Sequence, residues 1–340
     1  MHANKNAAPG WNREAAGLHV QTHQNHTAKV FTFGEVVDAF RAALRSAGLD
    51  TDAAIQADGR LHRFHVDGDR RGTVNGWYIL HVDGVPAAAF GHWKSGIGGT
   101  WRASIGRMLT RTEQADHRAR VEAARAMRCA EVAKARQVCR KRAATLWQAA
   151  KEVDAAHFYL IRKGIKPHGS RQHAARIVVP VVDTSDTLHG LQFIAADGGK
   201  RFLTDTAKTG CFHALGSPPL AAGSMLAIAE GFATAATIHE VTGWPTVTAF
   251  DAGNLEPVAL ALRAKYPSAR IVIGADNDHG TPGNPGLTKG RAAARAIGGT
   301  VIAPAFGAGD TGTDWNDYQA SYGRDATAAV LLNAVSEVRS

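Results

Sequence analysis

The sequence predicts an α/β protein with three parts: a Rossmann-like parallel sheet, a mixed α+β basic subdomain before it, and a small N-terminal antiparallel β/helical domain. Beyond residue 223, short apolar runs alternate strictly with helical segments, which is the pattern of a parallel sheet with right-handed crossovers. In 60–102 and 176–203, strand-like runs follow one another directly, which is the pattern of antiparallel sheets. A sharp change in charge separates the first 152 residues from the rest.

Charge indicates the kind of partner. Residues 1–152 carry 23 Lys and Arg against 14 Asp and Glu, whereas residues 153–340 carry 16 of each, so the whole net charge of +9 lies in the first part. A basic module joined to a neutral one with clustered acids is typical of a protein that grips a polyanion, and nucleic acid is the obvious polyanion. A solvated basic helix face is the alternative, and charge alone leaves both open.

Cysteine content and hydropathy disfavour several classes of protein. The three cysteines contain no Cys-x-x-Cys pair, so neither a zinc ribbon nor a disulfide framework is predicted, and no zinc is expected. No apolar run reaches the length of about 18 residues that spans a membrane, and the N-terminus lacks a hydrophobic signal core. We therefore expect a cytoplasmic protein with no membrane partner.

Local patterns predict the first elements. Residues at the N-terminus lack any periodicity and are expected to form a flexible tail. Apolar residues recur at helical spacing over 33–47, and Gly48 ends this helix. Alternating runs over 61–94 predict a small antiparallel sheet with a hairpin at Asp83-Gly84. The predicted boundaries are 1–28 for the tail, 29–110 for a small α+β domain that binds nucleic acid, and 111–152 for a basic helical linker.

Aromatic and cationic residues interleave on this predicted sheet. Such a mixture holds single-stranded nucleic acid, because rings stack on bases while cations meet phosphates. The alternative is that Phe64, Trp77 and Trp93 fill the core of a small sheet. The basic linker likewise either tracks a phosphate backbone or is a solvated spacer. The candidate DNA-binding residues are Arg63, Trp77, Trp93, Lys94, Trp101 and Arg102.

The second half of the chain combines an antiparallel meander with a parallel sheet. The predicted elements are a helix over 157–164, strands over 176–182, 188–194 and 200–203, then strand 225–230, helix 232–241, strand 246–250, helix 254–265, strand 270–275, helix 287–297 and strand 300–303. The predicted boundaries are 153–222 for the basic subdomain, 223–322 for the parallel-sheet catalytic domain and 323–340 for a C-terminal helix.

Carboxylates follow two of the predicted parallel strands. Glu230 ends one apolar run, and Asp276 and Asp278 follow another, where a spacing of two on an extended segment places both on one face. Asp314 and Asp317 form a third acidic group and share a face if a helix starts there. Ligands of open parallel sheets bind at the carboxyl ends of the strands, and carboxylates held this close are tolerated mainly around a divalent cation. We predict that the three groups form one site for Mg²⁺ or Mn²⁺.

Phosphoryl or nucleotidyl transfer is the chemistry that such a site indicates. Magnesium held by carboxylates commonly shares its coordination sphere with phosphate oxygens. One ion would activate an attacking hydroxyl, and the other would neutralise charge on the leaving phosphates. Cations are then needed to hold the phosphates of the nucleotide, and Lys200, Arg201 and Lys208 are the candidates.

These motifs resemble the Toprim domain that bacterial DnaG-type primases, topoisomerases and some nucleases share. More narrowly, they resemble the primases of conjugative plasmids and of phages and their satellites. The segments that carry the resemblance are Glu230-Gly231-Phe232-Ala233-Thr234-Ala235, Ala249-Phe250-Asp251-Ala252-Gly253-Asn254-Leu255, Ala275-Asp276-Asn277-Asp278, Asn284-Pro285-Gly286 and, upstream, Tyr159-Leu160-x-Arg162-x-Gly164, Val179-Pro180, Lys200-Arg201-Phe202-Leu203 and Lys208-Thr209-Gly210.

The resemblance implies roles for particular residues. It implies that Glu230, Asp276 and Asp278 are the main metal-binding carboxylates, that Asp314 and Asp317 add to them, and that Arg201 and Lys208, supported by Lys200, contact the incoming nucleotide or the template. The cysteines cannot build the N-terminal zinc-binding domain of cellular primases, and the chain ends soon after the catalytic domain. Both features fit a stand-alone primase of a mobile element.

The sequence thus predicts a DNA primase, a DNA-directed RNA polymerase that makes short primers on single-stranded DNA from nucleoside triphosphates, with a replicative helicase as a candidate partner. A Toprim nuclease that activates water is one alternative, and a non-catalytic protein that coats single-stranded DNA is another. The basic strand block 176–210 favours the primase, because a hydrolase has no nucleoside triphosphate to hold. The carboxylates argue against a mere scaffold, because paired carboxylates without a use would cost stability.

Overall fold

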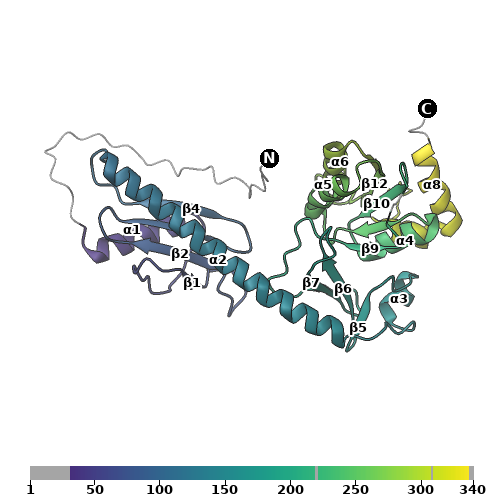
Figure 1. Cartoon of the computed structure of the whole chain (residues 1–340), viewed down its shortest axis with the longest axis horizontal. Coiled ribbons are helices and arrows are strands. Elements are labelled where there is room, and N and C mark those ends of the chain that lie inside the picture. The colour runs from purple at the N-terminus through teal and green to yellow at the C-terminus, as the bar shows by residue number, and fades with distance from the viewer. Residues whose placement is uncertain (1–30, 219–220, 308, 337–340) are drawn as a thin grey trace. The chain divides into compact units, whose positions relative to one another are not determined.

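The computed structural model describes residues 31–218, 221–307 and 309–336 (Figure 1). These residues form two compact units, which divide between Val132 and Ala133, inside the long helix α2 (Arg111–Ala149). The tail predicted at 1–28 and the segment 337–340 lie outside the described residues. In the described part of the chain, no helix is long and apolar enough to cross a membrane.

The first unit is built on a four-stranded antiparallel sheet in the order β1-β2-β3-β4. Helix α1 begins with a capping box, in which the Thr32 hydroxyl accepts a hydrogen bond from the Glu35 backbone N–H and the Glu35 carboxylate accepts one from the Thr32 backbone N–H. The antiparallel sheet predicted for this region is confirmed. The bounds are α1 Phe33–Ser46, β1 His62–Phe64, β2 Gly76–His81, β3 Ala87–His92 and β4 Gly98–Arg102.

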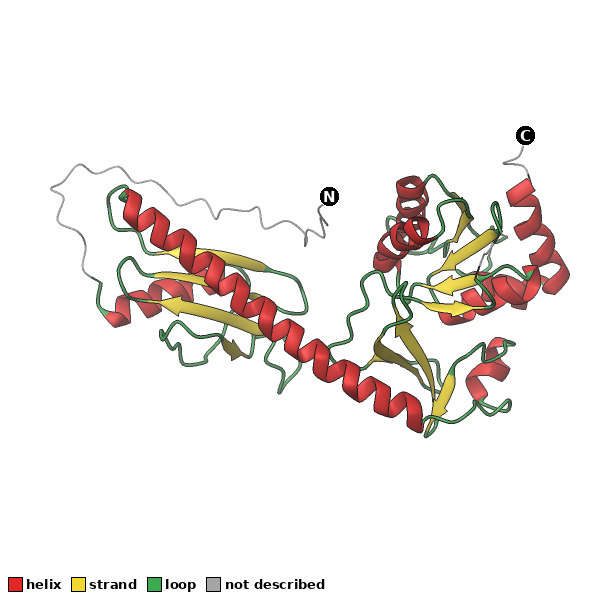
Figure 2. Ribbon diagram, in the orientation of Figure 1, coloured by secondary structure: helices red, strands yellow, loops and turns green. Residues whose placement is uncertain are grey.

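Helices cover both faces of this sheet (Figure 2). Successive side chains of a strand point to opposite faces, so Tyr78 and Leu80 of β2 pack with α1, whereas Trp77 and Ile79 pack under α2 beside Ala124. All four of these β2 side chains are buried. The first part of the helix predicted as a linker therefore belongs to the core of this unit.

The second unit starts with the end of α2 and a second antiparallel sheet, in the order β5-β6-β7-β8. Alternation again decides which face each residue covers. Val178 of β6 packs with Cys139 and Ala143 of α2, whereas Ile177 and Val179 face the core that this sheet shares with the parallel-sheet domain. The bounds are α3 Phe158–Lys163, β5 Arg171–His173, β6 Arg176–Val182, β7 Leu188–Ile194 and β8 Lys200–Phe202.

The parallel sheet that the strand and helix alternation predicts is confirmed. Its order is β13-β12-β10-β11-β9, and the first four strands run parallel. Strand β9 pairs antiparallel with β11 and was not among the predicted strands. The bounds are β9 His213–Leu215, β10 Met225–Ala229, α4 Phe232–Thr242, β11 Thr246–Thr248, a 3₁₀ turn at Ala252–Asn254, α5 Leu255–Lys265, β12 Arg270–Gly274, α6 Pro285–Ile297, β13 Thr300–Ile302, α7 Trp315–Tyr322 and α8 Arg324–Ser336.

Helices cover both faces of this sheet (Figure 1). Ala227 and Ala229 of β10 face α4, α7 and α8, whereas Leu226 and Ile228 face α5 and α6. The small alanines on one face let α4 approach the sheet closely. Because helices cover both faces, ligands of such a sheet are expected at the carboxyl ends of the strands, where the loops after β10 and β12 emerge.

Candidate active site

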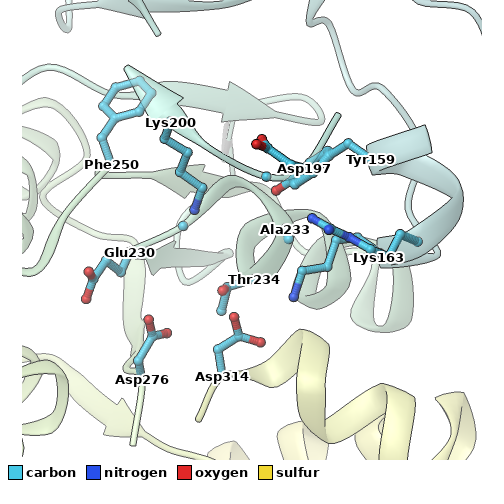
Figure 3. A pocket seen from close by; sticks show the side chains of 13 residues that line it. Tyr159, Lys163, Asp197, Lys200, Glu230, Ala233, Thr234, Phe250, Asp276 and Asp314 are labelled. Atoms are coloured by element: carbon cyan, nitrogen blue, oxygen red, sulfur yellow. The ribbon is translucent and has the colours of Figure 1, made fainter. Parts of the chain in front are cut away.

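The carboxyl ends of β10 and β12 open into a cavity of about 230 Å³. Glu230 directly follows β10, and Asp276 lies two residues beyond the end of β12. Figure 3 shows the carboxylates of Glu230, Asp276 and Asp314 on one side of this cavity and Lys163 and Lys200 on the other. The lining residues are Tyr159, Arg162, Lys163, Asp197, Gly198, Lys200, Glu230, Gly231, Ala233, Thr234, Phe250, Asp276 and Asp314.

Asp276 is the most perturbed acid of the site. Burial, followed by repulsion from Glu230, Asp314 and Asp278, raises its pKa to about 8. Its Oδ1 atom is buried and has no hydrogen-bond partner among the described residues. Burial and the charge of Asp278 also raise the pKa of Glu230. A cation placed among these groups would therefore relieve both the repulsion and the missing contact.

Asp278 is held by the start of α6. Its Oδ2 accepts a hydrogen bond of 2.8 Å from the Gly286 backbone N–H, and its own backbone N–H donates to Asn284 Oδ1 at 2.9 Å. A Cβ at position 286 would lie 2.8 Å from Asp278 Oδ2, so only glycine allows this approach. The carboxylate is thus fixed near Glu230 and Asp276, although it does not line the cavity itself.

The structure brings one of the two later aspartates into the site. Asp314 is the N-cap of α7, where it accepts a hydrogen bond of 2.8 Å from the Asp317 backbone N–H, and it lines the cavity. Asp317 points elsewhere: it pairs with Lys163 at 3.2 Å and accepts a hydrogen bond from the Thr313 backbone N–H. The two side chains do not act as one pair at the cavity, which departs from the predicted metal site.

Cations from the basic subdomain line the opposite side of the cavity. Lys200 is the cross-strand partner of Ile194, which faces this side of the sheet, whereas Arg201 is opposite Phe193, which packs toward α2. Directly opposed residues share a face, so Lys200 points into the cavity and Arg201 points away from it. Arg201 does not line this cavity, and its expected contact with the incoming nucleotide or the template stays a prediction.

Three functional candidates escaped the prediction. Arg162 and Lys163 of α3 line the cavity, and Asp251 forms an ion pair with Lys208. Arg162 and Asp251 lie inside the quoted motifs that carry the resemblance, so a signal existed. Lys163 carried no such signal, because the motif quoted for this helix specifies Arg162 and Gly164 but leaves the position between them open.

The donors around the cavity fit a hard divalent cation. The acidic residues at the strand ends offer carboxylate oxygens, which suit Mg²⁺ or Mn²⁺, and one of these oxygens is buried without a partner among the described residues. The side chains surround the cavity without converging. Within the described residues, no group of three or more His, Cys, Asp and Glu is close enough to hold a metal ion. Metal binding here therefore requires side-chain movements that bring carboxylates of the site closer together.

The candidate DNA-binding residues of the first unit divide into core and surface. Trp77 is only 1% exposed, and Arg128 of α2 lies 4.9 Å from its ring centroid and 5.2 Å from that of Trp93. Trp101 packs on the core under α1. Trp77 is therefore a core residue, which is the alternative that the sequence left open, and neither face of its ring is available to a base. The exposed cations of the set are Arg63, Lys94 and Arg102.

Comparison with known proteins gives a match to a family model and several relatives, two of which are described here. Residues 225–325 match the family model of the Toprim domain. Two relatives from Escherichia coli, both named DNA primase TraC, are 38% and 37% identical over 284 residues. The matches cover 79% and 80% of this chain but 19% and 27% of the relatives, so the chain spans less than a third of the length of the relatives it matches.

Solved primase structures are similar at low sequence identity. The primase fragment of the bacteriophage T7 primase-helicase is 14% identical with a TM-score of 0.40, covering 55% of this chain and 80% of that one. The DnaG primase catalytic domain bound to ssDNA is 11% identical with a TM-score of 0.41, covering 59% and 80%. The zinc-binding and RNA polymerase domains of the Aquifex aeolicus primase are 13% identical with a TM-score of 0.40, covering 88% and 85%.

Proposed function

The chain carries a Toprim domain at residues 225–325 and resembles two DNA primases over most of its length, and from this premise we propose that it is a DNA primase. It would copy single-stranded DNA into short RNA primers from nucleoside triphosphates. A conjugative plasmid, phage or other mobile element is the replication system that we infer for it, with a replicative helicase as a candidate partner. The two relatives are named DNA primases, which supports the primase reaction.

One observation carries the proposal: acids and cations face each other across a single cavity. Glu230, Asp276 and Asp314 come from the Toprim domain, whereas Arg162 and Lys200 come from the basic subdomain before it. A nucleoside triphosphate needs both kinds of group, because its phosphates pair with cations while a divalent metal bridges phosphates and carboxylates. A nuclease of the same fold needs the acids alone, so the facing cations favour nucleotidyl transfer.

The residues of this chain have separate roles in the proposed reaction. Lys200 and Arg162 would hold the phosphates of the incoming nucleotide, which orients the α-phosphorus toward the 3′-hydroxyl of the preceding nucleotide. The hydroxyl oxygen then forms a bond to the α-phosphorus, the bond to the bridging oxygen breaks, and pyrophosphate leaves. Glu230, Asp276 and Asp278 would hold Mg²⁺ or Mn²⁺, which when bound stabilises the charge that develops on the phosphates. Metal binding must release the proton of Asp276, so metal affinity should rise with pH up to about 8.

Primer synthesis on single-stranded DNA tests the proposal. Labelled nucleoside triphosphates and Mg²⁺ or Mn²⁺ would be supplied to the wild type, to Glu230→Gln and to the control Glu256→Gln, which makes the same change at an exposed position of α5. We expect short, template-dependent products from the wild type and the control, and a loss of at least about 100-fold with Glu230→Gln. Cutting of the template without synthesis would establish the nuclease alternative instead. If all three proteins bind DNA equally well and none reacts, the non-catalytic alternative holds, in which the fold serves only to bind DNA.

A further inference from the structure

Lys208 and Asp251 form an ion pair beside the cavity, although they come from different parts of the second unit. Lys208 belongs to the loop after β8, and Asp251 follows β11 of the parallel sheet. Both side chains are partly exposed, with 44% and 34% of their surface open to solvent. The ammonium group of Lys208 also lies 5.8 Å from the centroid of the Phe202 ring. The pair is therefore reachable by a charged ligand.

Asn254 fixes the backbone on both sides of this pair. Its buried side-chain amide donates hydrogen bonds to the carbonyl oxygens of Lys208, Cys211 and Ala249, each between 2.8 and 2.9 Å. Its carbonyl oxygen accepts a hydrogen bond of 2.8 Å from the Gly210 backbone N–H. One side chain thus connects the Lys208 loop to the end of β11. The backbone is fixed by these hydrogen bonds, whereas the two charged side chains are partly exposed.

Asp251 lies three residues beyond the end of β11, at the same end of the parallel sheet as Glu230. The preceding residue, Phe250, has a left-handed backbone with φ of 74°, which is rare for a residue with a large side chain and is tolerated where packing enforces it. Strand β11 pairs in parallel with β10, with Thr248 opposite Ala229, and the Thr248 hydroxyl donates a hydrogen bond of 2.9 Å to the Glu230 backbone carbonyl oxygen. In the structure, the Lys208 ammonium is the cation that compensates Asp251.

We propose that the Lys208–Asp251 ion pair is exchanged when substrate binds: a phosphate oxygen of the nucleotide takes over Lys208, and the released Asp251 carboxylate joins Glu230 in holding the divalent metal. This inference rests on the proposed function and deepens it. No covalent bond changes in the exchange. Two ion pairs, phosphate with Lys208 and metal with Asp251, replace the single pair. The nucleotide thus releases Asp251 for the metal, and the metal releases Lys208 for the nucleotide.

The exchange couples the two ligands. Metal alone must compete with Lys208 for Asp251, and nucleotide alone must compete with Asp251 for Lys208. Binding of either one therefore strengthens the binding of the other, and by linkage the factor is the same in both directions. Asp251 acts as a positioning residue for Lys208 in the free protein and as a further metal ligand in the complex.

Direct binding measurements test the exchange without any need for primer synthesis. Mn²⁺ binding would be followed by electron paramagnetic resonance, and α,β-methylene-ATP binding by calorimetry with and without Mn²⁺. The variants are Lys208→Met and Asp251→Asn, with Lys141→Met and Asp325→Asn as controls that make the same changes at exposed positions of the second unit. Asp251→Glu keeps the charge and serves as the conservative variant.

We expect Lys208→Met to bind Mn²⁺ about fivefold more tightly without nucleotide, because a competing ammonium group is gone. Asp251→Asn should bind Mn²⁺ about fivefold more weakly, bind the analogue more tightly without metal, and lose most of the coupling between the two, whereas Asp251→Glu should retain the coupling. Affinities for both ligands that match the wild type in Asp251→Asn would overturn this inference alone. Parallel loss of both affinities in Asp251→Asn would also overturn it, since that indicates a scaffold role. A wild type that binds neither ligand would overturn the proposed function together with it.

Discussion

Replacing Asp276 by Asn should make the metal-free protein more stable at about pH 8. Burial and three neighbouring carboxylates raise the pKa of Asp276 from 3.8 to about 8. An acid with a raised pKa in the folded state binds more protons when folded than when unfolded. The contribution of Asp276 to the free energy of unfolding is therefore most favourable below about pH 4 and declines as the pH rises to about 8. Above that pH, the folded protein carries the full free-energy cost of a buried charge.

The size of this stabilisation follows from the shift in the pKa of Asp276. A change of about four pKa units, at about 1.4 kcal/mol for each unit, sets an upper limit of about 6 kcal/mol. Glu230 also has a raised pKa, so protonation is shared among the carboxylates, and the cavity admits water. Both effects lower the free-energy cost of a charged Asp276. We therefore expect Asp276→Asn to raise the free energy of unfolding by about 1 to 3 kcal/mol at pH 8 without metal.

Urea unfolding between about pH 5 and about pH 9 measures this effect, in a chelator and then in excess Mg²⁺. The wild type should lose stability as the pH rises, and Asp276→Asn should flatten that slope. Asp325→Asn, an exposed change in the first turn of α8, is the control and should keep the wild-type slope. Added Mg²⁺ should stabilise the wild type but not Asp276→Asn. The reasoning is refuted if Asp276→Asn is less stable than the wild type in the chelator at pH 8, or if it keeps the same slope.

Three other outcomes follow from named contacts. Lys200→Met should weaken binding of a nucleoside triphosphate analogue about tenfold, measured by calorimetry, because a phosphate loses a cation that lines the cavity; Arg201→Met, on the other face of the sheet, should leave that affinity unchanged. Asn254→Ala should lower the free energy of unfolding by about 2 to 4 kcal/mol in urea, because four backbone groups lose their hydrogen-bond partner; a loss below about 1 kcal/mol would contradict the network. Trp77→Ala should cost about 3 to 5 kcal/mol by the same measurement, because the ring is a core residue.

Most of the fold could be predicted from the periodicity of apolar residues and from turn residues. The alternation of apolar strands and helices beyond residue 223 gave the parallel sheet, because both of its faces are buried and its strands are accordingly continuous apolar runs. Strand β5 has the wholly polar sequence Arg-Gln-His, and β9 has the sequence His-Ala-Leu, so neither contains the apolar run by which the other strands were predicted. Position in the tertiary structure, rather than local pattern, decides that β9 pairs with β11.

Side-chain direction limited the prediction of the site. Glu230 and Asp276 were predictable, because strand ends of a parallel sheet meet at one edge. Lys200 and Arg201 look equivalent in sequence, and only the register of β8 against β7 separates their faces. Trp77 likewise looks like a surface aromatic until α2 is seen to cover the second face of its sheet. Such facts depend on long-range packing, which neither composition nor spacing encodes.

The most direct test of the central claim is the fate of the label in one reaction on single-stranded DNA. Nucleoside triphosphates labelled at the α-phosphate would be compared with the same nucleotides labelled at the γ-phosphate. If the cavity between the Toprim carboxylates and Lys200 performs nucleotidyl transfer, chain growth retains the α-label and releases the γ-label as pyrophosphate, and Asp276→Asn abolishes both. No incorporation of α-label by the wild type, with Mg²⁺ or with Mn²⁺, would contradict the account.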